Sequence, residues 1–208
     1  MSKYRFLLSI CILLVLSGCN SQKTRFTLLQ LNDVYELSPL NAGKTGGLEV
    51  TVGNHEFDVG RTALLKRLAE STSVFFSDNI LDSVTQQPFA HSQKSVVFNV
   101  DDIKVGLVGV TLKHMPLDFV TFLDPLTTAQ KSIQQLKQQN VDVIILVTHQ
   151  DYTDDIAFAE KLDGVDLIIG GHEHENMYLV RGAKLVPITK ADANAKSAFV
   201  HTISVDKQ

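Results

Sequence analysis

The prediction of the fold starts from Val141-Asp142-Val143-Ile144-Ile145-Leu146-Val147 and the polar residues that follow, Thr148-His149-Gln150-Asp151. The first part is almost continuously apolar, which is typical of a strand that is covered on both faces. His149 therefore lies at the carboxyl end of a buried strand. Ligands of open α/β sheets bind at this end. A lone histidine there is more often structural, so other clusters must support a site.

The chain from Phe26 onward alternates strand and helix patterns, which predicts an α/β fold. Asp124-Pro125 supplies a helix cap and a proline at the first helical position, and Asn140 ends that helix. The last two strands have no helix between them, so we expect antiparallel pairing there. Helices are also predicted at 61–70 and 154–162, and strands at 26–31, 50–52, 73–76, 95–100, 104–110, 141–148, 166–169, 185–188 and 199–205.

Three more polar clusters follow predicted strands. They are Asn32-Asp33, Gly53-Asn54-His55-Glu56-Phe57-Asp58 and Gly170-Gly171-His172-Glu173-His174-Glu175. Each has a structural alternative: Asp33 could be a turn or cap residue, Asp58 could cap the next helix, and the third cluster could be a coincidental surface loop. In extended backbone, residues two apart point the same way, so His172 and His174 can converge on one site.

Parallel strands bring their carboxyl ends to one edge of a sheet, so these clusters are expected to meet. Carboxylate, amide and imidazole donors without thiolate suit Zn, Mn or Fe better than Ca. The predicted ligands are Asp33, Asn54, His149, His172 and His174.

The order of these motifs resembles that of the calcineurin-like metallophosphoesterases: an Asp, then Gly-Asn-His-Glu, then a strand-end His, then Gly-His-x-His. Leu-Gln-Leu-Asn-Asp-Val-Tyr-Glu at 29–36 and Gly-Asn-His-Glu-Phe-Asp at 53–58 resemble the 5′-nucleotidase and 2′,3′-cyclic phosphodiesterase branch. The resemblance runs from about Phe26 to the last residue. It implies an incomplete αββα sandwich and hydrolysis of nucleotide-like phosphomonoesters or cyclic phosphodiesters.

The resemblance also assigns roles to residues. Asn54, His149 and His172 resemble the ligands of one divalent metal ion, and Asp33 and His174 resemble ligands of a second. Two cations a few ångströms apart polarise a phosphoryl group and generate hydroxide near neutral pH.

The catalytic residues that the resemblance implies lie in the second motif. His55 resembles the family's histidine that stabilises or protonates the leaving group. Glu56 or Asp58 would orient its ring.

Two departures from the family pattern concern the first motif and the segment that follows it. Tyr35 occupies the place of a usual histidine, and no Gly-Asp motif supplies the aspartate that bridges the two metals. Only the sixteen residues Val34–Glu49 separate two strand ends, whereas a parallel crossover needs a dozen or more residues and normally a helix. We interpret this as an internal deletion near 48–50, natural or in the gene model. The larger relatives' C-terminal nucleotidase domain is also expected to be missing.

The amino terminus predicts export. Lys3 and Arg5 precede an apolar run that ends at Leu16-Ser17-Gly18-Cys19, the pattern of a signal peptide rather than a membrane span. The tetrad resembles a bacterial lipobox, whose Cys is acylated. We therefore expect a signal peptide at 1–18, a linker at 19–25 after lipidated Cys19, and a phosphoesterase domain at 26–208. The protein would be a lipoprotein anchored to a membrane and facing the periplasm or the cell exterior.

Composition limits the partners. The 208-residue chain has a formal charge of −4, and removal of residues 1–18 takes away two basic residues and no acids, giving −6. No basic patch indicates nucleic-acid binding, so any attraction for a phosphoester must come from a local cation.

The alternative to an enzyme is a catalytically silent metal-binding lipoprotein, which the missing bridging aspartate favours.

Replacement of the lipobox cysteine tests the predicted anchor. We expect the Cys19→Ser chain to leave the membrane fraction, because stable anchoring requires acyl chains that only the cysteine can carry. Fractionation followed by immunoblotting measures this. The same membrane association in both chains would contradict the lipobox interpretation.

Overall fold

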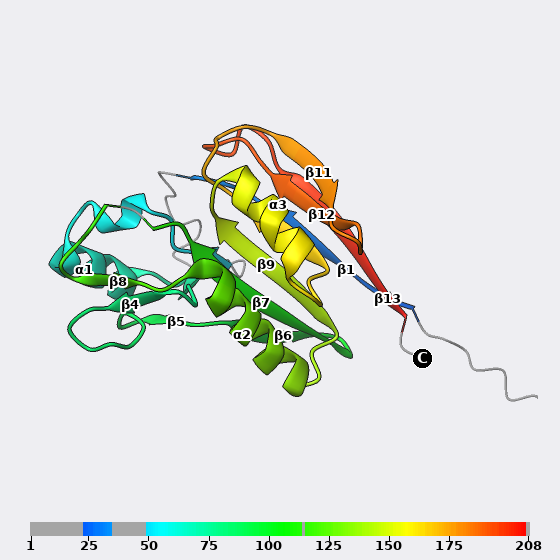
Figure 1. Cartoon of the computed structure of the whole chain (residues 1–208), viewed down its shortest axis with the longest axis horizontal. Coiled ribbons are helices and arrows are strands. Elements are labelled where there is room, and N and C mark those ends of the chain that lie inside the picture. The colour runs from blue at the N-terminus through cyan, green and yellow to red at the C-terminus, as the bar shows by residue number, and fades with distance from the viewer. Residues whose placement is uncertain (1–22, 35–48, 114, 207–208) are drawn as a thin grey trace, which may run out of the picture.

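The computed structural model describes residues 23–34, 49–113 and 115–206 (Figure 1). Predictions on the signal peptide, Cys19, Tyr35 and most of the segment around the proposed deletion fall outside these residues. Among the helices that the structure describes, none is long and apolar enough to cross a membrane.

A six-stranded sheet forms the centre of the molecule. Its order is β11-β12-β10-β9-β7-β6, with parallel pairing from β12 through β7 and antiparallel pairing at both edges. The predicted strand with the continuous apolar run is central in it. The strands are β6 (Val96–Val100), β7 (Ile103–Thr111), β9 (Val143–His149), β10 (Leu167–Gly170), β11 (Met177–Arg181) and β12 (Val186–Lys190).

Helices α2 (Pro125–Gln138) and α3 (Tyr152–Lys161) cover one face of this sheet (Figure 1). The side chain of Asp124 accepts a hydrogen bond from the Thr127 amide at 2.8 Å, which satisfies a donor that the first turn of α2 leaves without a partner. Buried residues of both helices pack on β7, β9, β10 and β12.

Shorter strands form the second layer. β1 (Lys23–Gln30) pairs antiparallel with β13 (Phe199–Asp206), and β2 (Glu49–Thr51), β3 (Val74–Phe76) and β5 (Ser92–Gln93) form a parallel sheet. β4 (Ile80–Asp82) pairs with β8 (Val120–Phe122), while α1 (Arg61–Glu70) and the 3₁₀ helix η2 (His55–Phe57) lie beyond them. The two packed sheets, with α2 and α3 on the outer face of one of them, confirm the predicted α/β sandwich.

Burial on β9 explains its unbroken apolar sequence. Ile144 and Leu146 face the α2/α3 layer, and Ile145 faces a second cluster that contains Phe26 and Phe76. Both faces of β9 are therefore excluded from water, as predicted for a covered strand.

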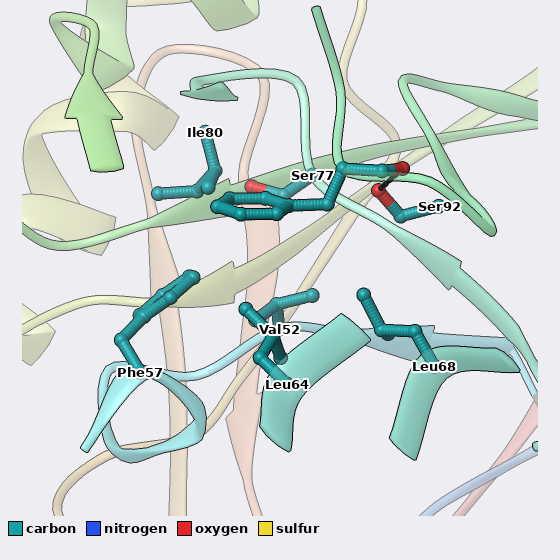
Figure 2. A pocket seen from close by; sticks show the side chains of 8 residues that line it. Val52, Phe57, Leu64, Leu68, Ser77, Ile80 and Ser92 are labelled. Carbon is teal, nitrogen blue, oxygen red and sulfur yellow. Dashed lines mark hydrogen bonds between the residues drawn. The ribbon is translucent and has the colours of Figure 1, made fainter. Parts of the chain in front are cut away.

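A third apolar cluster holds the turn that carries His55. Phe57 is 1% exposed and its ring lies 5.8 Å from that of Phe122. Figure 2 shows Phe57 with Val52 and Leu64 around a small cavity of about 10 Å³. The buried phenylalanine anchors η2, so the polar residues on either side of it lie at the surface.

Several element predictions need correction. The last two predicted strands do not pair with each other: β12 pairs with β10 and β11, and β13 pairs with β1. The strands β4, β5, β8 and β11 were not predicted, because most have only two or three residues, too few for a periodic pattern. The helix at 61–70 is confirmed, and α2 ends two residues before Asn140.

An ion pair connects α1 to β4. Arg61 donates to both carboxylate oxygens of Asp82, at 3.2 and 2.6 Å, and the Val84 amide donates to the same group at 2.9 Å. Asp82 is 2% exposed. The Arg61 guanidinium holds the pKa of Asp82 below its usual value. The stabilisation is therefore present above about pH 4 and is lost as the pH falls through the folded-state pKa.

We expect Asp82→Asn to lower the unfolding free energy at pH 7 by about 1.5–3 kcal/mol, typical of hydrogen bonds to charged groups. The difference between the two chains should narrow below about pH 4, and urea titrations from pH 3 to 7 measure it. Glu70→Gln is the matched control, because it breaks the exposed Lys66–Glu70 pair and should change little. Equal stability of Asp82→Asn and wild type at pH 7 would contradict this assignment.

Candidate metal centre

The polar residues that follow β1, β2, β9 and β10 meet at one edge of the molecule. A cavity of about 270 Å³ lies there, between β1 and the six-stranded sheet. Its polar lining includes Asp33, Glu56 and His149. The structure thus brings together clusters that are more than a hundred residues apart in the sequence.

The predicted ligands of the first metal lie close together. Asn54 Oδ1 is 2.8 Å from His149 Nε2, and the rings of His149 and His172 are 5.3 Å apart between centroids, arranged edge to face. Asn54 is 3% exposed. An amide oxygen and two imidazoles therefore form one compact group.

Asp33 connects this group to His174. Its Oδ1 lies 3.6 Å from His174 Nε2 and 3.7 Å from His149 Nδ1. Its Oδ2 accepts a hydrogen bond from the His172 amide at 3.1 Å. The Asp33 side chain is 4% exposed, so its carboxylate is held among three histidines.

The prediction of extended backbone at His172 and His174 is wrong. Both residues have positive φ, 93° and 60°, so the segment is a turn. Their side chains go to different partners, since His172 lies beside His149 and 3.3 Å from Asp151, whereas His174 lies beside Asp33.

Two glycines make room for His149. A Cβ atom on Gly53 would lie 3.0 Å from His149 Cε1, and one on Gly171 would lie 2.9 Å from Asp33 Oδ2 and 3.2 Å from His149 Nδ1. Contacts this short are rare for real Cβ atoms. Only glycine at both positions lets the donors approach one another this closely.

Electrostatics keep the central imidazole neutral. Burial lowers the pKa of His149 to about 4, although the Asp33 carboxylate opposes the shift. A neutral imidazole is the form that binds a metal ion. Desolvation raises the pKa of Glu56, and the charge of Asp33 adds to this effect.

The predicted catalytic histidine has one clear partner. His55 Nδ1 lies 2.8 Å from Asp58 Oδ2, and both side chains are about half exposed. The sequence left open whether Glu56 or Asp58 orients the ring of His55. In the structure Asp58 contacts His55, while Glu56 lines the cavity. Asp58 does not cap α1, whose N-cap residue is Gly60.

These donors match a divalent cation in chemical type, and the glycines leave the space that the ring of His149 needs. Among the described residues, however, no three His, Cys, Asp or Glu side chains form a group that could hold a metal ion. The closest donor pair includes the amide oxygen of Asn54. The described residues therefore fit one cation that is held partly by an amide, and they do not include a second complete set of ligands.

One important residue was missed in the sequence. Lys190, at the end of β12, is 1% exposed and contacts Glu173, which lies between the two histidines. The sequence carries a weak signal for it, because a lysine ends a strand whose other residues are apolar or small. Its burial could not be predicted from that pattern.

A sequence profile described as calcineurin-like phosphoesterase matches residues 18–176, which is most of the chain. The chain belongs to the calcineurin-like phosphoesterase family. It is 31% identical over 130 residues to the NAD 5′-nucleotidase of Haemophilus influenzae, covering 60% of this chain and 22% of that one. It is 33% identical over 140 residues to human 5′-nucleotidase, covering 62% and 24%. The chain thus spans about a quarter of the length of these relatives.

Solved structures agree with the fold. The Haemophilus influenzae NAD nucleotidase matches the chain with a TM-score of 0.65 and 23% identity, over 77% of this chain and 34% of that one. A 5′-nucleotidase precursor from Thermus thermophilus matches with a TM-score of 0.63 and 22% identity, over 76% and 38%. At such identities the likeness establishes the fold alone.

Calorimetric titration with Mn²⁺ tests the arrangement of the ligands. We expect one ion per chain, and His172→Ala should weaken binding by at least about 100-fold, since even second-sphere partners contribute about 10–100-fold. His91→Ala serves as the control, because His91 belongs to none of the motifs. Equal affinity of wild type and His172→Ala would rule out the assignment.

Proposed function

We propose that the chain is a metal-dependent phosphoesterase that acts on nucleotide-like phosphomonoesters or cyclic phosphodiesters. The observation that carries this proposal is the gathering of the predicted donors at one edge of the sheet. They are Asp33, Asn54, His149, His172 and His174.

Each residue has a specific task in this proposal. Asn54, His149 and His172 would hold a divalent cation, with Mn, Zn or Fe favoured by the donor types. A bound cation supplies Lewis acidity and a hydroxide near neutral pH. Asp58 holds Nδ1 of His55, so we assign proton transfer to the leaving group to Nε2 of that ring.

The relatives support a nucleotide-like substrate, since those with about 30% identity are named as 5′-nucleotidases. The cavity of about 270 Å³ is slightly below the usual range of about 300–1,000 Å³ for small-molecule sites. It therefore suits a phosphoryl group and part of the sugar, and a base would extend beyond it.

A deletion between the first two motifs remains part of this proposal. In the described residues β1 pairs only with β13 and β2 only with β3, and both β1 and the end of β2 line the same cavity. A strand missing between β1 and β2 would leave a gap in the sheet at this cavity. That strand would carry the Gly-Asp motif of the family.

The second candidate function is a catalytically silent metal-binding lipoprotein. The incomplete second set of ligands favours it, because Asp33 and His174 are its only described members. The predicted lipid anchor at Cys19 fits both candidates, so only an activity measurement separates them.

Hydrolysis assays with added Mn²⁺ make that separation. We expect the 208-residue chain to show little or no hydrolysis of nucleoside 5′-monophosphates or simple aryl phosphates. One misplaced electrostatic group typically costs about 10²–10³ in rate, and a lost metal should cost at least as much. A chain with the family's helix and Gly-Asp strand inserted after Leu48 should gain activity.

The inserted chain also supplies the controls. His55→Ala should remove the gained activity, whereas His91→Ala should leave it unchanged. Robust turnover by the 208-residue chain itself, abolished by a chelator, would contradict the expected loss of activity and require another group to bridge two metals.

A further inference from the structure

We propose that Lys190 is a positioning residue, whose buried ammonium group fixes the two segments that carry His149 and His172. The inference rests on the proposed function, because it concerns the same metal centre. It assigns a role to a residue outside every motif of the sequence.

The contacts of Lys190 Nζ connect the two segments directly. It donates to the carbonyl oxygen of Gln150 at 2.6 Å and to that of Gly171 at 2.9 Å. Gln150 follows His149, and Gly171 precedes His172. One ammonium group at the end of β12 therefore bridges the ends of β9 and β10.

Two carboxylates complete the surroundings of the ammonium group. Asp155 Oδ2 of α3 lies 2.9 Å from Lys190 Nζ, and Glu173 Oε2 lies 2.5 Å from it. Asp155 is completely buried. A buried lysine is rare unless its charge is paired, and here four oxygen atoms surround it.

Glu173 is held from both sides. Its Oε2 binds Lys190, and its Oε1 accepts a hydrogen bond from the Tyr152 amide at the start of α3. The neighbours of Glu173 in sequence are His172 and His174. Anchoring the residue between them fixes the position of the backbone from which both imidazole side chains extend.

Backbone conformation makes such an anchor necessary. His172 and His174 both have left-handed φ, which residues other than glycine adopt only where the surrounding structure enforces it. Without the Lys190–Glu173 contact, fewer interactions hold the turn in this conformation, so the φ angles of His172 and His174 relax more easily to negative values. The two imidazoles would then lose their places beside His149 and Asp33.

The test compares Lys190→Met with wild type in two measurements on the full chain. Hydrogen exchange of the metal-free protein should become faster in segments 150–153 and 171–174, while β1 and β13 keep their protection. Calorimetric titration should give a dissociation constant for Mn²⁺ about 10–100-fold weaker, the usual effect of a lost outer partner of a ligand.

Three further variants separate positioning from stability. Lys184→Met removes a surface ion pair with Asp163 and should change neither measurement. The double variant Lys190→Met/Asp155→Asn removes the buried acid together with its partner, so it should recover thermal stability but not Mn²⁺ affinity. Glu173→Gln keeps the size of the side chain, and should weaken Mn²⁺ binding in the same direction even if Lys190→Met fails to fold.

Each outcome decides the inference. Wild-type exchange and affinity in a folded Lys190→Met chain would overturn it, as would recovery of full affinity in the double variant. Faster local exchange, in a protein whose wild type binds no Mn²⁺, would support the positioning role and refute the proposed function instead.

Discussion

Parallel pairing of β9 with β7 and β10 is the constraint on which the candidate site depends. The register places Thr111 opposite His149 and Thr148 opposite Gly170, so these strands end at the same level. A slip by one residue would turn His149 to the other face of the sheet. The apolar residues of β9 point alternately into the two hydrophobic clusters on either side of it, and their burial opposes such a slip. Hydrophobic burial therefore determines where the imidazole is found.

Charge is concentrated inside the molecule at this edge. Asp33 lies among three histidines, and burial keeps the central one, His149, neutral. On the opposite side of the same turn, Lys190 is enclosed by two acids and two carbonyl oxygens. The chain as a whole is negatively charged, but a few buried groups determine the arrangement of charge at this edge. Such groups act strongly because little water screens them.

The sequence pattern predicted an α/β fold and named the five polar residues that gather at one edge, because a covered strand and its terminal polar residues leave a local pattern. The sandwich came from the family resemblance. The division of the histidines between two metals came from resemblance rather than from geometry. Local patterns cannot reveal the left-handed turn at His172 and His174, which contacts from α3 and β12 enforce. The burial of Lys190 likewise depends on long-range packing. Strands of two or three residues, such as β5, are too short for any periodic signal.

The central claim is that the strand ends form a site for one divalent cation. Anomalous X-ray scattering from crystals grown with Mn²⁺ tests it most directly. We expect one strong peak, about 2.0–2.3 Å from a ring nitrogen of His149 and from Asn54 Oδ1. Two equally strong peaks at this edge, or a peak only at a distance from His149 and Asn54, would contradict it.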